Sequence, residues 1–126
     1  MRYLGVDFGL SRIGLAQSQG NIASPLKTIE VKGFQDAQEK VKALVVSEGF
    51  DKIIIGLPEG KMGQTVLGFI KALRKAGIDV ETADETLSSQ RAVAQMIKLN
   101  IPKAKRRVSD AYSAAIILQN YLDLSK

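Results

Sequence analysis

Acidic side chains stand at three places in this chain where a carboxylate could take part in chemistry. Asp7 directly follows a short apolar run, the pair Asp84-Glu85 follows another, and Asp110 stands in the first turn of the last helical segment. Carboxylates that converge on one crevice can hold divalent cations, and two such cations about 3.5–4 Å apart can hydrolyse a phosphodiester bond. These positions predict metal-dependent hydrolysis if the fold brings them together.

Each position also has an explanation that involves no catalysis. Asp7 suits a turn in which its carboxylate accepts hydrogen bonds from local amides, and Asp110 is an ordinary first-turn residue of a helix. The Asp84-Glu85 pair suits the start of a helix, where the dipole favours negative charge. Two adjacent carboxylates repel each other, so placing both in one crevice requires a compensating charge such as a cation. The spacing alone leaves both interpretations open.

The composition limits which chemistry is possible. The 126 residues include no Cys and no His, which excludes disulfides, thiolate zinc sites, a Cys nucleophile and a His general base. Oxygen ligands remain, and they favour Mg²⁺ or Mn²⁺ over softer metals. The chain carries 18 basic and 13 acidic residues, a net charge of +5, which favours a polyanionic partner such as nucleic acid.

Hydrophobic periodicity predicts the elements that position these acids. The predicted strands cover residues 3–6, 12–18, 26–31, 52–55 and 78–82. The first three are joined by links too short for crossover helices, so they form an antiparallel meander. At Phe34 the period changes to that of a helix. The predicted helices cover 34–48, a segment after the turn-rich residues 59–63 that stops at Gly77, a segment from 88 or 89 to about 100, and a last helix with Ser109 as its N-cap.

The order of these elements predicts an α/β fold with a mixed sheet. Right-handed crossovers place the later strands parallel to the first, so the first strand is central, between the second and the fourth, and helices cover both faces. Beside the first strand the strand order reverses, and the carboxyl ends of the strands open a crevice there. The small residues Ala111, Ala114 and Ala115 would let the last helix approach the sheet closely and bring Asp110 toward Asp7.

Length and apolar pattern also bound the organisation of the chain. We expect a single domain over residues 1–126. No apolar run reaches the roughly 18 residues of a membrane span, and Met1–Asp7 does not form a signal peptide. We therefore expect a cytoplasmic protein, a monomer or weak homodimer, with no membrane partner.

Four segments, in order and at appropriate separations, resemble the motifs of the YqgF (RuvX-like) family. The segments are Asp7–Ala16, Ile55–Pro58, Asp84–Ser89 and Asp110–Gln119, and the resemblance covers essentially the whole chain. It implies an RNase H-like fold related to the RuvC junction resolvases, with a five-stranded sheet of order 3-2-1-4-5 whose second strand is antiparallel. It also implies that Asp7, Glu85 and Asp110 are the catalytic acids and bind the metal, Mg²⁺ or Mn²⁺.

Two positions depart from the family pattern. Thr86 stands where the family usually has Arg, a group that would contact phosphate. The loop after Pro58 usually reads Leu-x-Met-x-Gly, but here it contains Glu59 and Lys61. Lys61 could supply the lost basic contact, but the sequence favours solvated turn residues as the explanation of this loop. The predicted nucleic-acid contacts are Arg12, Lys61, Lys103, Lys105, Arg106 and Arg107.

The function predicted first is a two-metal-ion endonuclease that processes the 5′ end of precursor 16S ribosomal RNA. The nearest alternative is a Holliday junction resolvase that acts on branched DNA; the sequence does not separate the two. A non-catalytic nucleic-acid-binding relative is favoured by Thr86 but opposed by the retention of all three acids. A sugar-kinase-like or actin-like nucleotide-binding protein shares an Asp-x-Gly turn, but it needs two such domains and this length supplies one.

Overall fold

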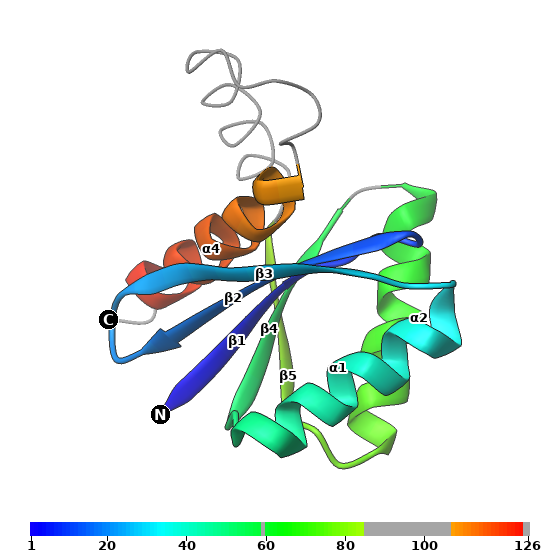
Figure 1. The fold of residues 1–126 in the computed structure, drawn as a ribbon, viewed down its shortest axis with the longest axis horizontal. Helices are drawn as coiled ribbons and strands as arrows, with labels where there is room; N and C mark the ends of the chain where they lie inside the picture. Colours follow the sequence, from blue (N-terminus) through cyan, green and yellow to red (C-terminus); the bar gives the residue numbers. More distant parts are fainter. Residues whose placement is uncertain (59, 85–106, 125–126) are drawn as a thin grey trace.

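Strands and helices alternate in the order that the sequence predicts (Figure 1). The structure, a computed structural model, describes residues 1–58, 60–84 and 107–124. Its strands are β1 (Arg2–Asp7), β2 (Arg12–Gln19), β3 (Ala23–Glu30), β4 (Lys52–Leu57) and β5 (Val80–Asp84). Its helices are α1 (Phe34–Glu48), α2 (Lys61–Lys75) and α4 (Arg107–Leu124). The helix predicted from 88 or 89 to about 100 lies outside the described residues.

These strands form a five-stranded mixed sheet of order β3-β2-β1-β4-β5. β2 runs antiparallel to β1 and β3, whereas β4 is parallel to β1 and β5 is parallel to β4. The predicted strand order and the predicted central place of β1 are confirmed. The carboxyl ends of β1, β4 and β5 therefore meet the amino end of β2 at one edge of the sheet (the carboxyl edge, marked by Asp7, Leu57, Asp84 and Arg12).

Helices cover both faces of this sheet, as predicted (Figure 1). α1 and α2 lie on one face, where the buried cluster includes Val41 and Phe69. α4 lies on the other face, where the buried cluster includes Ile54, Ala114 and Leu118. Among the parts of the chain that the structure describes, no helix is long and apolar enough to cross a membrane.

Alternation along β1 sets the direction of Asp7. Leu4 and Val6 belong to the cluster beneath α1 and α2, while Tyr3 packs against the cluster beneath α4. Successive side chains of a strand point to opposite faces of the sheet. Asp7 is therefore in phase with Tyr3 and points to the α4 face, where it is half-buried.

The start of β3 differs from the prediction. β3 begins at Ala23, before the predicted start at 26, so Pro25 lies inside the strand. β3 is an edge strand of the sheet, where a residue without an amide hydrogen is tolerated. The register passes from Leu15 opposite Lys27 to Ala16 opposite Pro25, which leaves one extra residue in β3. A β-bulge thus accommodates the proline.

The start of α2 also differs, because residues predicted as a turn belong to the helix. α2 begins at Lys61, inside the predicted turn 59–63, and its N-cap Gly60 has a φ of 76°. Gly63 lies in the first turn of α2, where a Cβ atom would stand 2.4 Å from the carbonyl oxygen of Pro58. The glycine therefore serves a close contact between α2 and the end of β4, and it does not mark a turn.

Two more element ends shift by a few residues. β5 covers Val80–Asp84, two residues later than the predicted 78–82. α4 begins at Arg107, so Ser109 lies in its first turn and is not its N-cap. Apolar periodicity fixes the middle of an element better than its ends, where several residues are compatible with either state.

Candidate functional site

Two glycines let α4 lie directly on the central strands. A Cβ atom on Gly14 of β2 would stand 1.9 Å from the carbonyl oxygen of Asp110, and one on Gly5 of β1 would stand 2.9 Å from that of Ala114. Side chains do not tolerate such separations, so the Gly14 position admits only glycine while the helix stays in place. The close approach predicted from the small residues of α4 is confirmed, and Ala111 and Ala114 are buried.

The same contact brings Asp7 and Asp110 to one place. Asp7 is the register partner of Gly14 across the β1–β2 pair. Residues opposed in this way have Cα atoms about 4.5–5.5 Å apart and side chains on the same face. Because Asp110 lies against Gly14, its carbonyl oxygen is within roughly 9 Å of the Cα atom of Asp7. Two of the three predicted acids thus converge at the carboxyl edge on the α4 face.

A tight turn returns the chain from Asp7 to Arg12. A Cβ atom on Gly9 would stand 2.5 Å from the carbonyl oxygen of Arg12, so this turn needs a glycine. The Ser11 carbonyl oxygen accepts a hydrogen bond from the amide of Val31 at 2.9 Å, which ties the turn to the end of β3. Arg12 consequently starts β2 at the carboxyl edge, next to the first turn of α4.

Arg12 and Asp110 form an ion pair that leaves the carboxylate incompletely satisfied. Arg12 Nε lies 3.2 Å from Asp110 Oδ2, and the Asp110 side chain is 24% exposed. Among the described residues, no donor reaches the buried Oδ2 with hydrogen-bond geometry, the Nε–H group of Arg12 included. Burial raises the pKa of Asp110 above its ordinary value of 3.8, and the Arg12 charge opposes that rise. A carboxylate oxygen with unused lone pairs therefore lies at the carboxyl edge.

The remaining acids of the predicted site are less fully described. Glu85, the third predicted metal ligand, lies outside the described residues, as do Glu59 and Thr86. Asp84 ends β5, and its backbone pairs with that of Leu57 in β4. β5 therefore delivers the chain to the same edge of the sheet as β1.

The donors at this edge fit a hard divalent cation. Asp7 and Asp110 offer oxygen ligands only, which suits Mg²⁺ or Mn²⁺, and the buried Oδ2 of Asp110 lacks the hydrogen bond that would otherwise occupy it. Residues 1–58, 60–84 and 107–124 contain no group of three or more His, Cys, Asp or Glu side chains that could hold a metal by themselves. Water, substrate oxygens or a further acid from outside these ranges would complete the coordination of a cation here.

The predicted nucleic-acid contacts are described in part. Arg12 stands beside Asp110, and Lys61 is exposed as the first residue of α2, just after the carboxyl end of β4. Arg107 is the first residue of α4 and does not belong to a loop before that helix. The predicted contacts Lys103, Lys105 and Arg106 lie outside the described residues.

Sequence reasoning did not identify two features of the site. Gly14 was not singled out as a site residue, although a glycine inside a strand often marks the close approach of another backbone. Lys32 and Lys40 were not singled out either, yet both line a groove beside Arg12. No local pattern predicts these lysines, because the groove forms only when β3 and α1 come together.

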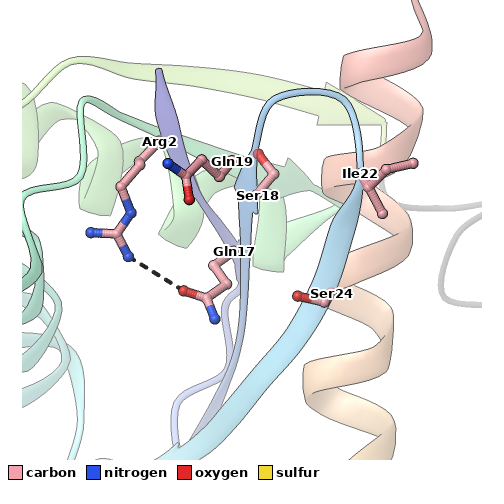
Figure 2. A pocket seen from close by; sticks show the side chains of 6 residues that line it. All are labelled: Arg2, Gln17, Ser18, Gln19, Ile22 and Ser24. Atoms are coloured by element: carbon pink, nitrogen blue, oxygen red, sulfur yellow. Dashed lines mark hydrogen bonds between the residues drawn. The ribbon is translucent and has the colours of Figure 1, made fainter.

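A separate hollow lies at the opposite end of β1 and β2 (Figure 2). It has a volume of about 180 Å³ and is lined by Arg2, Gln17, Ser18, Gln19, Ile22 and Ser24. Arg2 Nη2 lies 3.5 Å from Gln17 Oε1. None of these lining side chains is acidic, so this hollow is not the candidate cation site.

The sheet order, the helices on both faces and the acids at the carboxyl edge together define an RNase H-like fold. Two solved structures share it. A Thermus thermophilus RuvC in complex with a Holliday junction substrate superposes with a TM-score of 0.63 at 19% identity, over 99% of this chain and 95% of that one. A fowlpox virus resolvase in complex with Holliday junction DNA superposes with a TM-score of 0.65 at 13% identity, over 99% of both chains. At such identities the likeness shows the fold alone.

Within this fold, the chain belongs to the RuvX family. The family model described as "RuvX: Holliday junction resolvase" matches residues 1–124. A relative from Clostridioides difficile described as "Putative pre-16S rRNA nuclease" is 36% identical over 97% of this chain and 94% of its own length. A relative of the same description from Thermoanaerobacter pseudethanolicus is 37% identical over 100% of this chain and 99% of its own length. The resemblance stated from the sequence motifs is confirmed.

Proposed function

We propose that this chain is a metal-dependent endonuclease that acts at the 5′ end of precursor 16S ribosomal RNA during ribosome biogenesis. The observation that carries the proposal is the place of Asp110: Gly14 holds it beside Asp7, and its buried Oδ2 lacks a hydrogen bond. Membership of the RuvX family and the description of the relatives support a nucleic-acid substrate.

In this proposal Asp7, Asp110 and Glu85 hold Mg²⁺ or Mn²⁺. Bound cations of this kind activate water for attack on a phosphodiester and stabilise the leaving oxygen. Asp7 ends a central strand and Asp110 lies in the first turn of a packed helix, so both offer oxygens from rigid elements. Arg12 partly neutralises Asp110, and its half-exposed guanidinium is free to form charge-assisted hydrogen bonds with a substrate phosphate on its solvent side.

We assign the third ligand to Glu85 and not to Asp84, because the resemblance of Asp84–Ser89 to the family motif implies Glu85 as a catalytic acid. Glu85→Gln should therefore abolish cleavage, whereas Asp84→Asn should have a much milder effect. The opposite order of effects would assign the ligand to Asp84.

A Holliday junction resolvase is the second candidate, because the description of the family model names that activity. We rank RNA first because relatives at 36% and 37% identity over nearly the whole chain carry the rRNA description. A non-catalytic binder is ranked last. Such a protein gains nothing from placing Asp7 and Asp110 where phosphates would lie, since both repel the ligand.

We extend the proposal to further basic residues and to properties of the whole chain. Lys61 and the basic residues at positions 103, 105, 106 and 107 would contact phosphates around the site. The chain would act as a single domain, a monomer or weak homodimer in the cytoplasm.

A substrate panel tests the proposed function. The purified protein would be incubated with Mg²⁺ or Mn²⁺ and a 5′-extended 16S precursor RNA, an unrelated single-stranded RNA or a four-way DNA junction. We expect cleavage of the precursor RNA that stops when EDTA is added and is absent in Asp7→Asn. Cleavage of the junction alone would favour the second candidate. Tight binding without cleavage of any substrate would contradict both.

A further inference from the structure

A basic groove opens beside the acids, on the far side of Arg12. It has a volume of about 620 Å³, within the range of sites that bind small ligands. Its lining residues are Ser11, Arg12, Glu30, Val31, Lys32 and Lys40. Arg12 is shared: it lines the groove and its Nε also lies 3.2 Å from Asp110 Oδ2. Arg12 therefore separates a ligand in this groove from the proposed cation site.

The Lys40 ammonium of this groove is held in place by its neighbours. Lys40 Nζ donates a hydrogen bond to the carbonyl oxygen of Glu30 at 2.7 Å and lies 3.1 Å from Asp36 Oδ2. Asp36 also accepts a hydrogen bond from the amide of Lys32 at 2.8 Å. This bond and Lys40 lower the pKa of Asp36, so it stays ionised and keeps both contacts at neutral pH. The groove thus has a position for positive charge, at Lys40, that exists before any ligand binds.

A second hollow extends this groove along α1. It has a volume of about 380 Å³, shares Lys40 with the first and adds Lys27. Its other lining side chains include the apolar Ile29 and Leu44, together with Glu48 at the far end. Basic side chains beside apolar ones suit a ligand with a repeating anionic backbone and apolar flat groups, which is the chemistry of a single nucleic-acid strand.

We infer that this groove holds the phosphodiester backbone of a single strand on one side of the bond to be cut. Arg12 would contact the phosphate nearest the acids, and Lys32 and Lys40 the phosphates beyond it. Glu30 is the one acid among the described residues that line the first hollow, while Arg12 and Lys40 also pair with acids beside it, Asp110 and Asp36. The inference rests on the proposed function and adds the path of the substrate strand to it.

Two lysines of one helix provide a matched test. Lys40 lines the groove, while Lys42 is exposed, lies two residues further along α1 and lines neither hollow. Residues two apart on a helix face different directions. Lys40→Gln and Lys42→Gln therefore remove the same charge from the same helix, but only the first removes it from the groove. Lys32→Gln is the third variant, since it removes the charge and keeps the backbone amide that donates to Asp36.

The measurement is the affinity of each variant for a labelled single-stranded RNA at several salt concentrations, in EDTA. Lys32→Gln and Lys40→Gln should each lower the log–log salt slope by about 0.7 and weaken binding about fivefold at 0.1 M salt. Lys42→Gln should leave the slope within error of the wild type. Equal losses in all three variants, or losses confined to duplex RNA, would overturn the inference. An unchanged slope in Lys32→Gln would do so even if Lys40→Gln fails to fold.

The binding and cleavage measurements test the groove and the proposed function separately. Binding is measured without metal and does not depend on cleavage. A protein that cuts the precursor RNA but shows unchanged slopes in Lys32→Gln and Lys40→Gln keeps the proposed function and loses the groove. A protein that cuts nothing, but whose lysine variants bind more weakly as described, keeps the groove and loses the proposed function.

Discussion

Asp110 lies in an environment that disfavours its charge. An acid that serves only to start a helix lies in solvent, near the free amides of the first turn. Oδ2 of Asp110 is instead buried beside the Arg12 guanidinium, and within residues 1–58, 60–84 and 107–124 it has no hydrogen-bond donor. Titratable groups in such surroundings are more frequent at functional sites than elsewhere. This favours the catalytic interpretation over the ordinary helix start.

Removing the Asp110 charge should stabilise the protein. Its folded pKa is raised above the ordinary value of 3.8, so ionisation disfavours the folded state. The wild type therefore loses stability as the pH rises from the unfolded pKa through the folded one. Asp110→Asn should raise the melting temperature at pH 7.5 by on the order of 2–5 °C. The gain should shrink as the pH approaches 4, as thermal unfolding at a series of pH values would show. A less stable variant at pH 7.5 would mean that the ion pair with Arg12 stabilises the Asp110 carboxylate by more than its burial costs.

Neutralising Asp7 should separate cleavage from binding. Asp7→Asn removes a proposed metal ligand, and losing several kcal/mol of transition-state stabilisation lowers the rate by about 10³-fold or more. RNA binding should be unchanged or tighter, because one negative charge facing the phosphates is gone. Single-turnover cleavage and filter binding would measure the two effects. Asp123→Asn, at the other end of α4 from Asp110, is the control and should cleave normally. Near-normal cleavage by the Asp7→Asn variant would show that Asp7 is not a metal ligand.

At the scale of the elements, the contact between α4 and β2 decides whether the acids meet. Gly14 is the point of closest approach, since a Cβ atom there would stand 1.9 Å from the Asp110 carbonyl oxygen. The same arrangement recurs one helical turn later, where a Cβ atom on Gly5 would stand 2.9 Å from the Ala114 carbonyl oxygen. Because Gly14 and Gly5 have no side chains, α4 can pack directly against β1 and β2. The first turn of α4 is positioned by packing, and the acids are positioned with it.

Adding one methyl group at Gly14 should therefore disrupt both stability and the site. Gly14→Ala should lower the free energy of unfolding by about 3 kcal/mol or more, because the clash is with backbone that cannot rotate away. Gly68→Ala is the control: it lies in the middle of α2, and its nearest atom, on Phe34, is 3.8 Å from the new Cβ. It should stabilise by roughly 0.5–1 kcal/mol through helix propensity. Urea denaturation of both variants would check this, and a neutral Gly14→Ala would show that α4 does not lie so close.

The sequence predicts the sheet because its signals are local. Apolar alternation, short links and the change of period at Phe34 are sufficient for the meander of the first three strands and the central place of β1, whereas the full strand order is implied by the family resemblance. The convergence of Asp7 and Asp110 is also predicted, since strand ends and a helix rich in alanine meet at one edge. The strand was predicted to start at 26, after Pro25, whereas a β-bulge at an edge strand accommodates the proline. Gly63 was predicted in a turn, whereas a close contact requires it.

The basic groove could not be predicted in the same way. Arg12, Lys32 and Lys40 come from the start of β2, the link after β3 and the middle of α1. They share no period and no motif, and only the packing of α1 against the sheet brings them together. The Arg12–Asp110 pair is likewise a contact between residues about a hundred positions apart. Tertiary contacts of this kind leave no trace in a single sequence.

At the scale of the whole molecule, charges of opposite sign are separated over a short distance. The acids lie on the α4 side of the carboxyl edge, whereas Lys32 and Lys40 lie on the side of α1. Arg12 lies between them. A polyanionic strand can therefore be attracted by the lysines while the acids stay available for cations. The net charge of +5 favours the approach of such a strand from a distance.

Binding of the cation should stabilise the whole fold. A ligand that binds only the folded state adds about 2.7 kcal/mol at a hundred times its dissociation constant, which raises the melting temperature by on the order of 10 °C. Mn²⁺ should produce this shift in the wild type and in Asp123→Asn, and EDTA should reverse it. Asp7→Asn and Asp110→Asn should lose most of it. An equal shift in all four proteins would place the cation elsewhere on the surface.

The most direct test of the shared cation site is the anomalous scattering of Mn²⁺ in a crystal of this protein. We expect a peak at the carboxyl edge whose ion contacts carboxylate oxygens of both Asp7 and Asp110, at ligand distances of about 2.1 Å as for Mg²⁺. A crystal saturated with Mn²⁺ that shows peaks only elsewhere, or that places the two carboxylates more than about 10 Å apart, would contradict a site for two cations about 4 Å apart.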